Sequence, residues 1–527
     1  MCGFMTGPFA KGDEQQVENE FQRIQYRGPD HSNKVWFKDH FIGFHRLAIM
    51  DLSPSGHQPF VSQQKHLVCN GEIYNYKGLA KQHDLKLHSN SDCEVILPLI
   101  EKFGLQQTCL QLDGEYAFVM FDEQRATYVA ARDPMGVRPL FYGKIKNDKS
   151  CRYAFASEVK SLSALCEDIK PFPPGHYFDG KEIKPYLIIE EVKKFSTHSE
   201  KEVLKNIRDL FIEAVNKRLD SDAPLGFLLS GGLDSSLVCS IATKILKKPI
   251  TTFAVGINEK PIDTKYAQVV AEYIGSKHHE VLFKKEDIFR TLHDLIYRLE
   301  TYDITSIRAS MGMSLLCEYI QKETDVKVLL TGEVSDELFG YKYTDFAPNA
   351  YEFQKESEKR IKELYMYDIL RADRCIASNS LEARVPFSDT DFVQYALSIN
   401  PELKMNSTGV GKHLLRKAFE GDFLPQDILY REKAAFSDAV GHSVVDYLVA
   451  YAATQYSDKD LFLAQVKYEH ATPRTKEALL YREIFESRFT GQSQLVKDFW
   501  LPNRDWENCD VEDPSARVLP NYGASGV

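Results

Sequence analysis

The stretch LGFLLSGGLDSS (residues 225–236) sets an apolar strand directly before a glycine-rich loop. We expect a helix over residues 235–247 to follow it. Glycines let a backbone approach a phosphate closely, and the start of a helix offers free N–H groups with a favourable dipole. The stretch is neither a Walker loop, which carries a lysine after its second glycine, nor a dinucleotide-fold glycine pattern. It therefore predicts another kind of phosphate-binding loop at the end of a strand.

Strands and helices alternate after this loop, and that alternation predicts a parallel sheet. The expected strands are residues 225–229, 251–255, 280–283 and 326–330, with a helix at residues 266–274. The remainder, to about residue 489, has mainly helical spacing. We therefore expect a C-terminal parallel α/β sheet domain with many helices.

The first part of the chain has short, strand-like apolar segments and few helices. Strands are expected at residues 41–50, 66–69, 116–121, 126–131, 140–143 and 153–156, and helices near 14–24 and at 92–103. Asp92 is placed to cap the second helix, and Pro98 within it predicts a kink. Many strands with few helices predict stacked sheets with helices outside.

A chain of 527 residues is too long for one ordinary core, so we expect a multi-domain α/β protein. The first domain is expected at residues 2–188 and the second at residues 204–489. Between them, residues 189–203 are rich in Glu, Lys, Ser and Thr and are interpreted as a linker. Residues 490–527 are expected to form a loose tail.

Composition narrows the functional class. Hydrophobic residues make up 43% and charged residues 27%, as in soluble globular proteins, and the net charge of -11 argues against a nucleic-acid partner. The apolar runs are shorter than the roughly 20 residues of a membrane span, so no membrane association is expected. The start lacks the pattern of a signal peptide. The ten cysteines contain no CxxC pair, which favours a reducing, cytoplasmic setting.

Cys2 directly follows Met1, and a small second residue allows Met1 to be removed. Removal leaves Cys2 with a free α-amino group, which titrates at about 7.7–8.0 and can take the thiol proton near neutral pH. Taken alone, a cysteine at the second position is weak evidence for catalysis.

Four further segments strengthen that hypothesis. They are YRGPD (residues 26–30), HRLAI (45–49), NGEIYN (70–75) and NSD (90–92), and they occur in this order after Cys2. Together they resemble the glutaminase domain of class II glutamine amidotransferases. The resemblance covers nearly all of residues 2–186 and implies an αββα sandwich of the N-terminal nucleophile type.

The resemblance also implies a role for each residue. Cys2 is the nucleophile, and Asn70 and Gly71 stabilise the oxyanion. Glutamine is bound by Arg46 at its carboxylate, by Glu72 and Asp92 at its ammonium and amide, and by the segment Leu47, Ala48, Ile49 and Met50. Arg27 has a structural role nearby. The plainer interpretations are a surface ion pair for Arg46 and a helix cap for Asp92.

The glycine-rich loop resembles the pyrophosphate-binding loop of ATP pyrophosphatases. A second segment, TGEVSDE (residues 331–337), ends another strand and resembles that family's second loop. The resemblance implies that ATP contacts Leu229, Ser230, Gly231, Gly232, Asp234, Ser235, Val255, Thr331, Gly332 and Lys412. It places Asp234 and Asp336 on Mg²⁺ and Glu333 near the adenylate, and Lys412 and Lys433 where charge builds during the reaction.

The order of the two domains, together with SLEARVPF (380–387), FSD (436–438) and YREIF (481–485), resembles the glutamine-hydrolysing asparagine synthetases. The likeness runs from Cys2 to about Phe489. It implies that aspartate, glutamine and ATP give asparagine, glutamate, AMP and pyrophosphate through β-aspartyl-AMP, with ammonia passed from Cys2 to the second site. It also implies a homodimer, which the residues themselves do not show.

Some positions depart from the family pattern. Val334 stands where the family has glycine, one glycine rather than two precedes Tyr341, and Met311-Gly312 replaces Thr-Pro. Valine disfavours a positive φ, so the loop backbone is expected to differ. These departures keep two alternatives open: an amidotransferase acting on another carboxylate, and a degenerate homologue that only binds glutamine or nucleotide. A β-lactam-forming relative would not need the nucleophilic cysteine.

Overall fold

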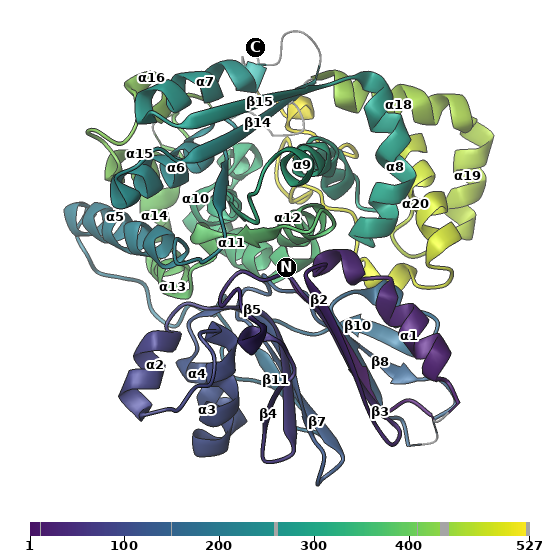
Figure 1. Ribbon diagram of the computed structural model, residues 1–527. Coiled ribbons are helices and arrows are strands. Elements are labelled where there is room, and N and C mark those ends of the chain that lie inside the picture. The colour runs from purple at the N-terminus through teal and green to yellow at the C-terminus, as the bar shows by residue number, and fades with distance from the viewer. Residues whose placement is uncertain (11, 149, 258–261, 408, 433–441, 523–527) are drawn as a thin grey trace. The chain divides into compact units, whose positions relative to one another are not determined.

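The computed structural model describes residues 1–10, 12–148, 150–257, 262–407, 409–432 and 442–522. Its ribbon is drawn in Figure 1. The chain divides into two compact units. Unit 1 holds Met1–Ile189, Asp220–Pro224 and Ile376–Ala383, and unit 2 holds Glu190–Leu219, Leu225–Cys375 and Arg384–Val527. The sequence pattern gave no sign of the two short segments that unit 1 takes from the chain beyond residue 189.

Unit 1 contains two six-stranded antiparallel sheets. One has the order β10-β8-β9-β1-β3-β2 and the other β12-β11-β7-β6-β5-β4. The strands are β1 (Gly3–Gly7), β2 (His31–Phe37), β3 (His40–Arg46), β4 (Phe60–Ser62), β5 (Lys65–Ile73), β6 (Gly114–Asp122), β7 (Thr127–Arg132), β8 (Phe141–Ile145), β9 (Tyr153–Ala156), β10 (Cys166–Pro171), β11 (His176–Phe178) and β12 (Ile183–Pro185).

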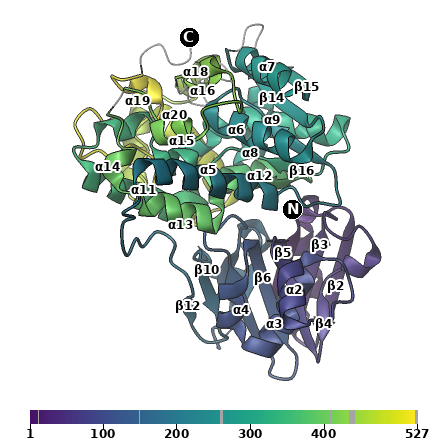
Figure 2. The same cartoon turned by 90° about the vertical axis from the view of Figure 1, so that its left-hand side faces the viewer.

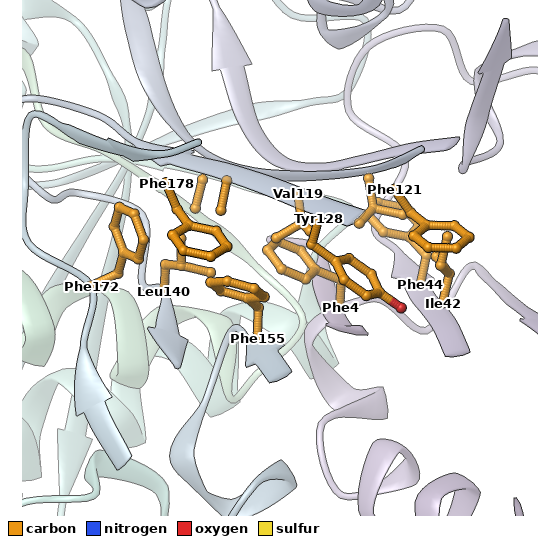
Figure 3. Close-up of a cluster of buried hydrophobic side chains, with 13 residues drawn as sticks. Phe4, Ile42, Phe44, Val119, Phe121, Tyr128, Leu140, Phe155, Phe172 and Phe178 are labelled. Atoms are coloured by element: carbon orange, nitrogen blue, oxygen red, sulfur yellow. The ribbon is translucent and has the colours of Figure 1, made fainter. Parts of the chain in front are cut away.

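Aromatic side chains from both sheets fill the space between them. Phe4, Phe44 and Phe155 come from the first sheet, and Phe121 and Phe178 come from the second. Figure 3 shows these rings gathered in one layer. Burial of such large rings is the main contribution that holds two sheets face to face.

Helices cover the outer faces of the sandwich. They are α1 (Glu14–Gln22), α2 (Tyr76–His83), α3 (Ile96–Phe103) and α4 (Leu105–Gln111). Helix α1 places Phe21 against Phe41 and His45 of β3, and α3 and α4 contact β4 and β11. The predicted arrangement of stacked sheets with helices outside is confirmed, although α2 and α4 were not predicted.

Two local predictions for unit 1 are wrong. Strand β3 ends at Arg46, and residues 47–50 form a loop, because Ala48 N–H donates to Asp30 Oδ2 (2.8 Å) rather than to a neighbouring strand. Asp92 does not cap a helix; it begins a 3₁₀ turn, Asp92–Val95, that leads into α3. Pro98 lies in the first turn of α3, where a helix has no N–H bond to lose.

Unit 2 is built on a parallel sheet. Its strands β15 (Lys277–Phe283), β14 (Thr251–Ile257), β13 (Leu225–Leu228) and β16 (Val328–Leu330) run in that order. Strand β17 (Glu382–Arg384), whose first two residues belong to unit 1, follows β16 in the sheet, and the Arg384 carbonyl accepts from Thr331 N–H. Helices α7 and α9 both contact β14 and lie on opposite sides of it in Figures 1 and 2. The predicted parallel α/β sheet is confirmed.

Helices make up most of the rest of unit 2. They are α5 (Glu200–Lys217), α6 (Leu233–Leu246), α7 (Ile262–Ile274), α8 (Lys285–Leu299), α9 (Ile304–Glu323), α10 (Ser335–Phe339), α11 (Ala350–Glu363), α12 (Asp368–Ala377, shared with unit 1), α13 (Thr390–Ser398), α14 (Pro401–Lys404), α15 (His413–Ala418), α16 (Gln426–Leu429), α18 (His442–Gln455), α19 (Asp458–Lys467) and α20 (Lys476–Arg488). In the described part of the chain, no helix is long and apolar enough to cross a membrane.

The segment after α20 has little regular structure, yet it is packed. Trp506, Cys509 and Leu519 are buried against Tyr343 and Phe353. The expectation of a loose tail is therefore wrong for this segment. A stretch rich in Pro, Asn and Asp lacks helix and strand patterns, but the few apolar side chains that it contains can still pack in a buried cluster.

Candidate active sites

Cys2 lies immediately before β1, and its thiol faces the loop after β3. The Sγ atom is 3.6 Å from the Leu47 carbonyl oxygen. Burial raises the pKa of the thiol to about 11, and the pKa of the Met1 ammonium falls to about 5 for the same reason. Met1 is fully buried and donates to the Leu381 carbonyl (3.1 Å). A thiolate is therefore disfavoured at neutral pH while Met1 is attached.

Arg27 fixes the backbone of the nucleophile candidate. Its Nε donates to the Cys2 carbonyl (2.9 Å), and its Nη1 is paired with Glu158 (2.6 Å). Both charged side chains are completely buried. A buried, paired guanidinium costs free energy to break, so this contact holds the start of β1 in one position. The geometry supports the structural role expected for Arg27.

Asn70 is a fully buried amide with no hydrogen-bond partner. Neither its Oδ1 nor its Nδ2 has one among the described residues, and the side chain is 0% exposed. Buried amides are almost always paired, so an unpaired one marks a place where a ligand can bind. Gly71 follows it on β5, and a Cβ there would lie 2.3 Å from the Glu115 carbonyl oxygen. Only glycine fits at this point of the strand.

Arg46 ends β3 and is 4% exposed, so it is no surface ion pair. Its Nη1 donates to the Ser53 carbonyl (2.8 Å), and its Nη2 donates to the carbonyls of Met50 (3.2 Å) and Asp51. These bonds use three of the five guanidinium N–H groups and wrap residues 47–53 around the arginine. The sequence predicted a ligand for Arg46 and missed this role in shaping the loop.

Asp92 reaches β5 rather than a helix end. Its Oδ2 accepts from Ile73 N–H (2.6 Å), and the neighbouring Cys93 Sγ lies 3.3 Å from the Gly71 carbonyl. Glu72 is buried on the same strand. Asp51 connects this side to the Arg46 loop, since its Oδ2 accepts from Asn90 N–H (2.8 Å). The predicted glutamine-binding residues are thus joined through neighbouring segments of unit 1.

In unit 2, the glycine-rich loop leads from β13 into α6. Helix α6 begins at Leu233, two residues earlier than predicted, so Asp234 and Ser235 lie in its first turn. Gly231 has a φ of +71°, and a Cβ there would lie 2.5 Å from Ala267 N. Gly231 is therefore required by both conformation and space. Arg431 supports the loop, since its Nη1 donates to the Gly231 carbonyl (3.1 Å).

The ammonium group of Lys412 contacts both candidate metal ligands, Asp234 and Asp336. Its Nζ lies 2.8 and 2.9 Å from the two carboxylate oxygens of Asp234 and 2.6 Å from Asp336 Oδ1. Ser335 Oγ is 3.0 Å from the same ammonium and donates to Asp234 Oδ1 (2.8 Å). Residues from three distant parts of the sequence therefore meet at one charged group.

In the second loop, Val334 adopts a positive φ, a backbone conformation that favours glycine. Val334 has a φ of +82° and is 2% exposed. The expectation that the loop backbone would change is wrong, because Val334 remains left-handed as the N-cap of α10. A β-branched residue in this region is strained by about 1–3 kcal/mol. Gly332, two residues earlier, packs directly against the first turn of α6. A Cβ at Gly332 would lie only 2.8 Å from Ser235 N.

One pocket spans these two loops. Of the predicted residues, its lining includes Leu229, Ser230, Gly232, Asp234, Ser235, Val255, Thr331, Gly332, Glu333, Asp336 and Lys412. Gly231 is not part of that lining. Within the pocket, Glu333 Oε2, Thr331 Oγ1 and Arg371 Nε are buried without a partner among the described residues. Unpaired hydrogen-bond donors and acceptors in one cavity favour the binding of a polar ligand.

Sequence analysis missed several charged residues of this pocket. Arg371 pairs with Asp368 (2.9 Å) and lies 3.5 Å from Glu333, while Arg416 lies one turn after Lys412. Burial, with the nearby charges of Asp368 and Asp336, raises the pKa of Glu337 to about 8. The i, i+3 and i, i+4 spacings were the only available signal, and such spacings are common on exposed helices.

Other predicted residues lie elsewhere. Lys433 and the segment 436–438 fall outside the described residues. Met311 and Gly312 belong to α9 but do not line the pocket, whereas Ala309 and Met313 of the same helix do. Met311 is fully buried, with its sulfur 3.9 Å from Thr291 Oγ1 of α8. The two departures from the family pattern in α9 therefore affect helix packing rather than the pocket wall.

The pair Asp234 and Asp336 fits a magnesium ion. The two carboxylates converge on one cation, and Mg²⁺ is commonly held by one or two carboxylates together with phosphate oxygens. No group of three or more His, Cys, Asp or Glu side chains suited to a metal occurs among the described residues.

Comparisons with known proteins agree with the two-part architecture. Residues 1–210 match the family described as glutamine amidotransferase domain, and residues 206–351 and 344–512 match asparagine synthase. The chain is 41% identical to the glutamine-hydrolysing asparagine synthetases of Cricetulus griseus and Gallus gallus, and 40% identical to that of Homo sapiens. Each comparison covers 95% of this chain and 95% of the relative.

The strain at Val334 can be measured with a matched pair of variants. Val334→Gly loses a buried side chain, which costs about 1.5–3 kcal/mol, but releases strain of about 1–3 kcal/mol. Val328→Gly loses the same buried group in β16, outside the left-handed region, and gains no relief. We expect chemical denaturation to show that Val334→Gly is less destabilising by about 1–3 kcal/mol. Equal losses would show that Val334 is unstrained.

Proposed function

Because the chain belongs to the family of glutamine-hydrolysing asparagine synthetases, we propose that it makes asparagine from aspartate, glutamine and ATP. The products are asparagine, glutamate, AMP and pyrophosphate. The observation that carries this proposal is the coexistence, along one chain, of two features: a unit that holds Cys2 against the Leu47 loop and contains the unpaired buried amide of Asn70, and a pocket whose two loops converge on Lys412. The first supports amide hydrolysis, and the second supports ATP chemistry.

In the glutaminase half, the Cys2 thiol attacks the carboxamide carbon of glutamine. Once Met1 is removed, the α-amino group of Cys2 accepts the thiol proton, which offsets the high thiol pKa caused by burial. Asn70 Nδ2 donates to the oxyanion, since it has no other partner among the described residues. Ammonia leaves, and water then hydrolyses the thioester to glutamate.

Glutamine binding is assigned to the segments around the thiol. The three carbonyl bonds of Arg46 leave its Nε–H and one Nη1–H for the substrate carboxylate. Leu47, Ala48, Ile49 and Met50 form the loop beside Cys2, and Gly71, Glu72 and Asp92 supply the polar groups near β5. In this proposal Arg46 both shapes the loop and binds the substrate.

In the synthetase half, a carboxylate oxygen of aspartate attacks the α-phosphorus of ATP and pyrophosphate leaves. The phosphates lie on the loop of Ser230–Ser235, with Lys412 balancing their charge, and adenine contacts Val255. Glu333 has an unpaired buried oxygen in the pocket and accepts a proton from ammonia as the amide forms. Lys433 is retained from the family resemblance as a further cation near the intermediate.

Magnesium fits between Asp234 and Asp336 and would balance the charge of the phosphates. We also propose that the enzyme is cytoplasmic, because all ten cysteines are free, as is usual in a reducing compartment. A homodimer remains a proposal that rests on the family resemblance alone.

The experiment that tests the function follows nitrogen from glutamine to product. Purified protein, with Met1 removal checked by mass, is incubated with ATP, Mg²⁺, aspartate and amide-¹⁵N glutamine. We expect labelled asparagine with AMP and pyrophosphate. Cys2→Ala is expected to lose this activity with glutamine and keep it with ammonia, because only the nucleophile is removed. Glutamate release without asparagine would refute aspartate as the acceptor and favour another carboxylate.

A second prediction concerns the unpaired amide. Asn70→Ala should lower the kcat of glutamine hydrolysis by about 10²–10³, as expected for loss of one oxyanion donor. It should leave thermal stability nearly unchanged, because no hydrogen bond is lost. The matched control is Asn75→Ala, whose amide bonds Gln111 O and Asp113 N, and which should lose stability rather than activity. An active Asn70→Ala enzyme would contradict the oxyanion role.

A further inference from the structure

The segment after α20 supplies part of the wall of the synthetase pocket. Trp500, Pro514, Ser515 and Ala516 line it together with residues of the two loops. None of these four residues belongs to a motif recognised in the sequence. Their presence in the wall raises the question of what holds an irregular segment against a pocket.

An aromatic cluster fixes the middle of the segment. Trp506, Cys509 and Leu519 are at most 5% exposed and pack against Tyr343, which itself lines the pocket. The Arg360 guanidinium lies over both the Tyr343 ring (5.3 Å) and the Trp500 ring (4.6 Å). Buried aromatic contacts of this kind give a segment one preferred position.

Two polar contacts fix the segment to the first turns of α9. The Asp303 carboxylate accepts from Trp500 N–H (2.7 Å) and also caps α9 through Ser306 N–H. Farther along, Asp513 pairs with Arg308 through two hydrogen bonds of 2.7 and 3.0 Å. Arg308 is also paired with Glu477, and its side chain is 3% exposed. Thr305 and Ala309, on either side of Arg308 in sequence, line the pocket.

We propose that this segment, held by the ion pair of Asp513 with Arg308, closes the synthetase pocket against water while the aspartyl adenylate awaits ammonia. Asp513 is thereby a positioning residue for amide formation, acting through Arg308 and through the adjacent wall residues Pro514 to Ala516. The inference rests on the proposed function and deepens it.

A wall that excludes water would favour amide formation over hydrolysis of the adenylate. Ammonia attacks the acyl carbon of the adenylate, a C–N bond forms, the C–O bond to phosphate breaks, and AMP leaves as the nitrogen loses a proton. Water attacking the same carbon returns aspartate and AMP with release of protons, so ATP is consumed without product. Excluding water from the pocket therefore decides how much ATP is converted into asparagine.

The test measures the ratio of pyrophosphate to asparagine with ammonia as nitrogen source. Asp513→Asn keeps the Arg308 pair with Glu477, so the fold should survive. We expect the ratio to rise about tenfold, the effect of losing one charged hydrogen bond. Asp513→Glu should restore the ratio. The control, Asp510→Asn, removes a 73% exposed carboxylate from the same segment and should match the wild type.

Equal losses of pyrophosphate and asparagine in Asp513→Asn, or an unchanged ratio, would overturn the proposal. A second measurement does not depend on asparagine. In a Trp36→Phe background, Trp500 and Trp506 are the only tryptophans of the chain. Mg²⁺, ATP and aspartate should lower acrylamide quenching of their fluorescence, and Asp513→Asn should abolish that protection.

The two measurements separate the two proposals. Wild-type protein that makes no asparagine but shows ligand-dependent protection of the tryptophans would overturn the proposed function and keep the wall. Wild-type protein that makes asparagine with unchanged quenching would overturn the wall and keep the function.

Discussion

The synthetase pocket depends on one ammonium group. Lys412 contacts Asp234 from the first loop and Asp336 from the second, and Ser335 bonds both the lysine and Asp234. Without this cation, two carboxylates would face each other in a largely buried site, which costs several kcal/mol. In the proposed function, the same arrangement would give phosphates and a metal ion a position where charges are already matched. Folding of the two loops and the proposed binding of ATP therefore draw on one electrostatic centre.

Polar groups of two kinds occur in the candidate sites. Those of the supporting residues are paired within the protein, whereas some of the residues proposed to contact a ligand have polar atoms that are buried without a partner in the described part of the chain. Arg27 donates to the Cys2 carbonyl and pairs with Glu158, and these filled bonds hold the start of β1 in place. In contrast, Asn70 and Glu333 keep buried polar atoms without partners among the described residues. Leaving such atoms unpaired costs about 1–3 kcal/mol each, so their retention is a sign of function. The two residues lie in different units: an amide, Asn70, in unit 1 and a carboxylate, Glu333, in unit 2.

Much of this could be predicted, because strand–loop–helix signals are local. The loop after β13 and the loop after β16 were recognised from glycines, carboxylates and the preceding apolar strand. The bonds of Arg46 to its own loop and the packed segment around Trp506 could not be, because they depend on contacts between residues whose spacing carries no periodic signal. The pair of Arg371 with Asp368 has helical i, i+3 spacing, but this spacing is equally common on exposed helices. Val334 illustrates a different difficulty. Valine intrinsically disfavours a positive φ, as expected from the sequence, but tertiary packing holds Val334 at a φ of +82°.

The most direct test of this account measures pyrophosphate release from ATP with aspartate, ammonia and Mg²⁺ in Lys412→Met. Lys417→Met, on the same helix with an exposed pair to Glu200, is the control. The account predicts that Lys412→Met loses pyrophosphate release by about 10²-fold or more while glutamine hydrolysis and Lys417→Met remain normal. Normal pyrophosphate release in Lys412→Met would contradict the claim that this ammonium group is the centre of the ATP site.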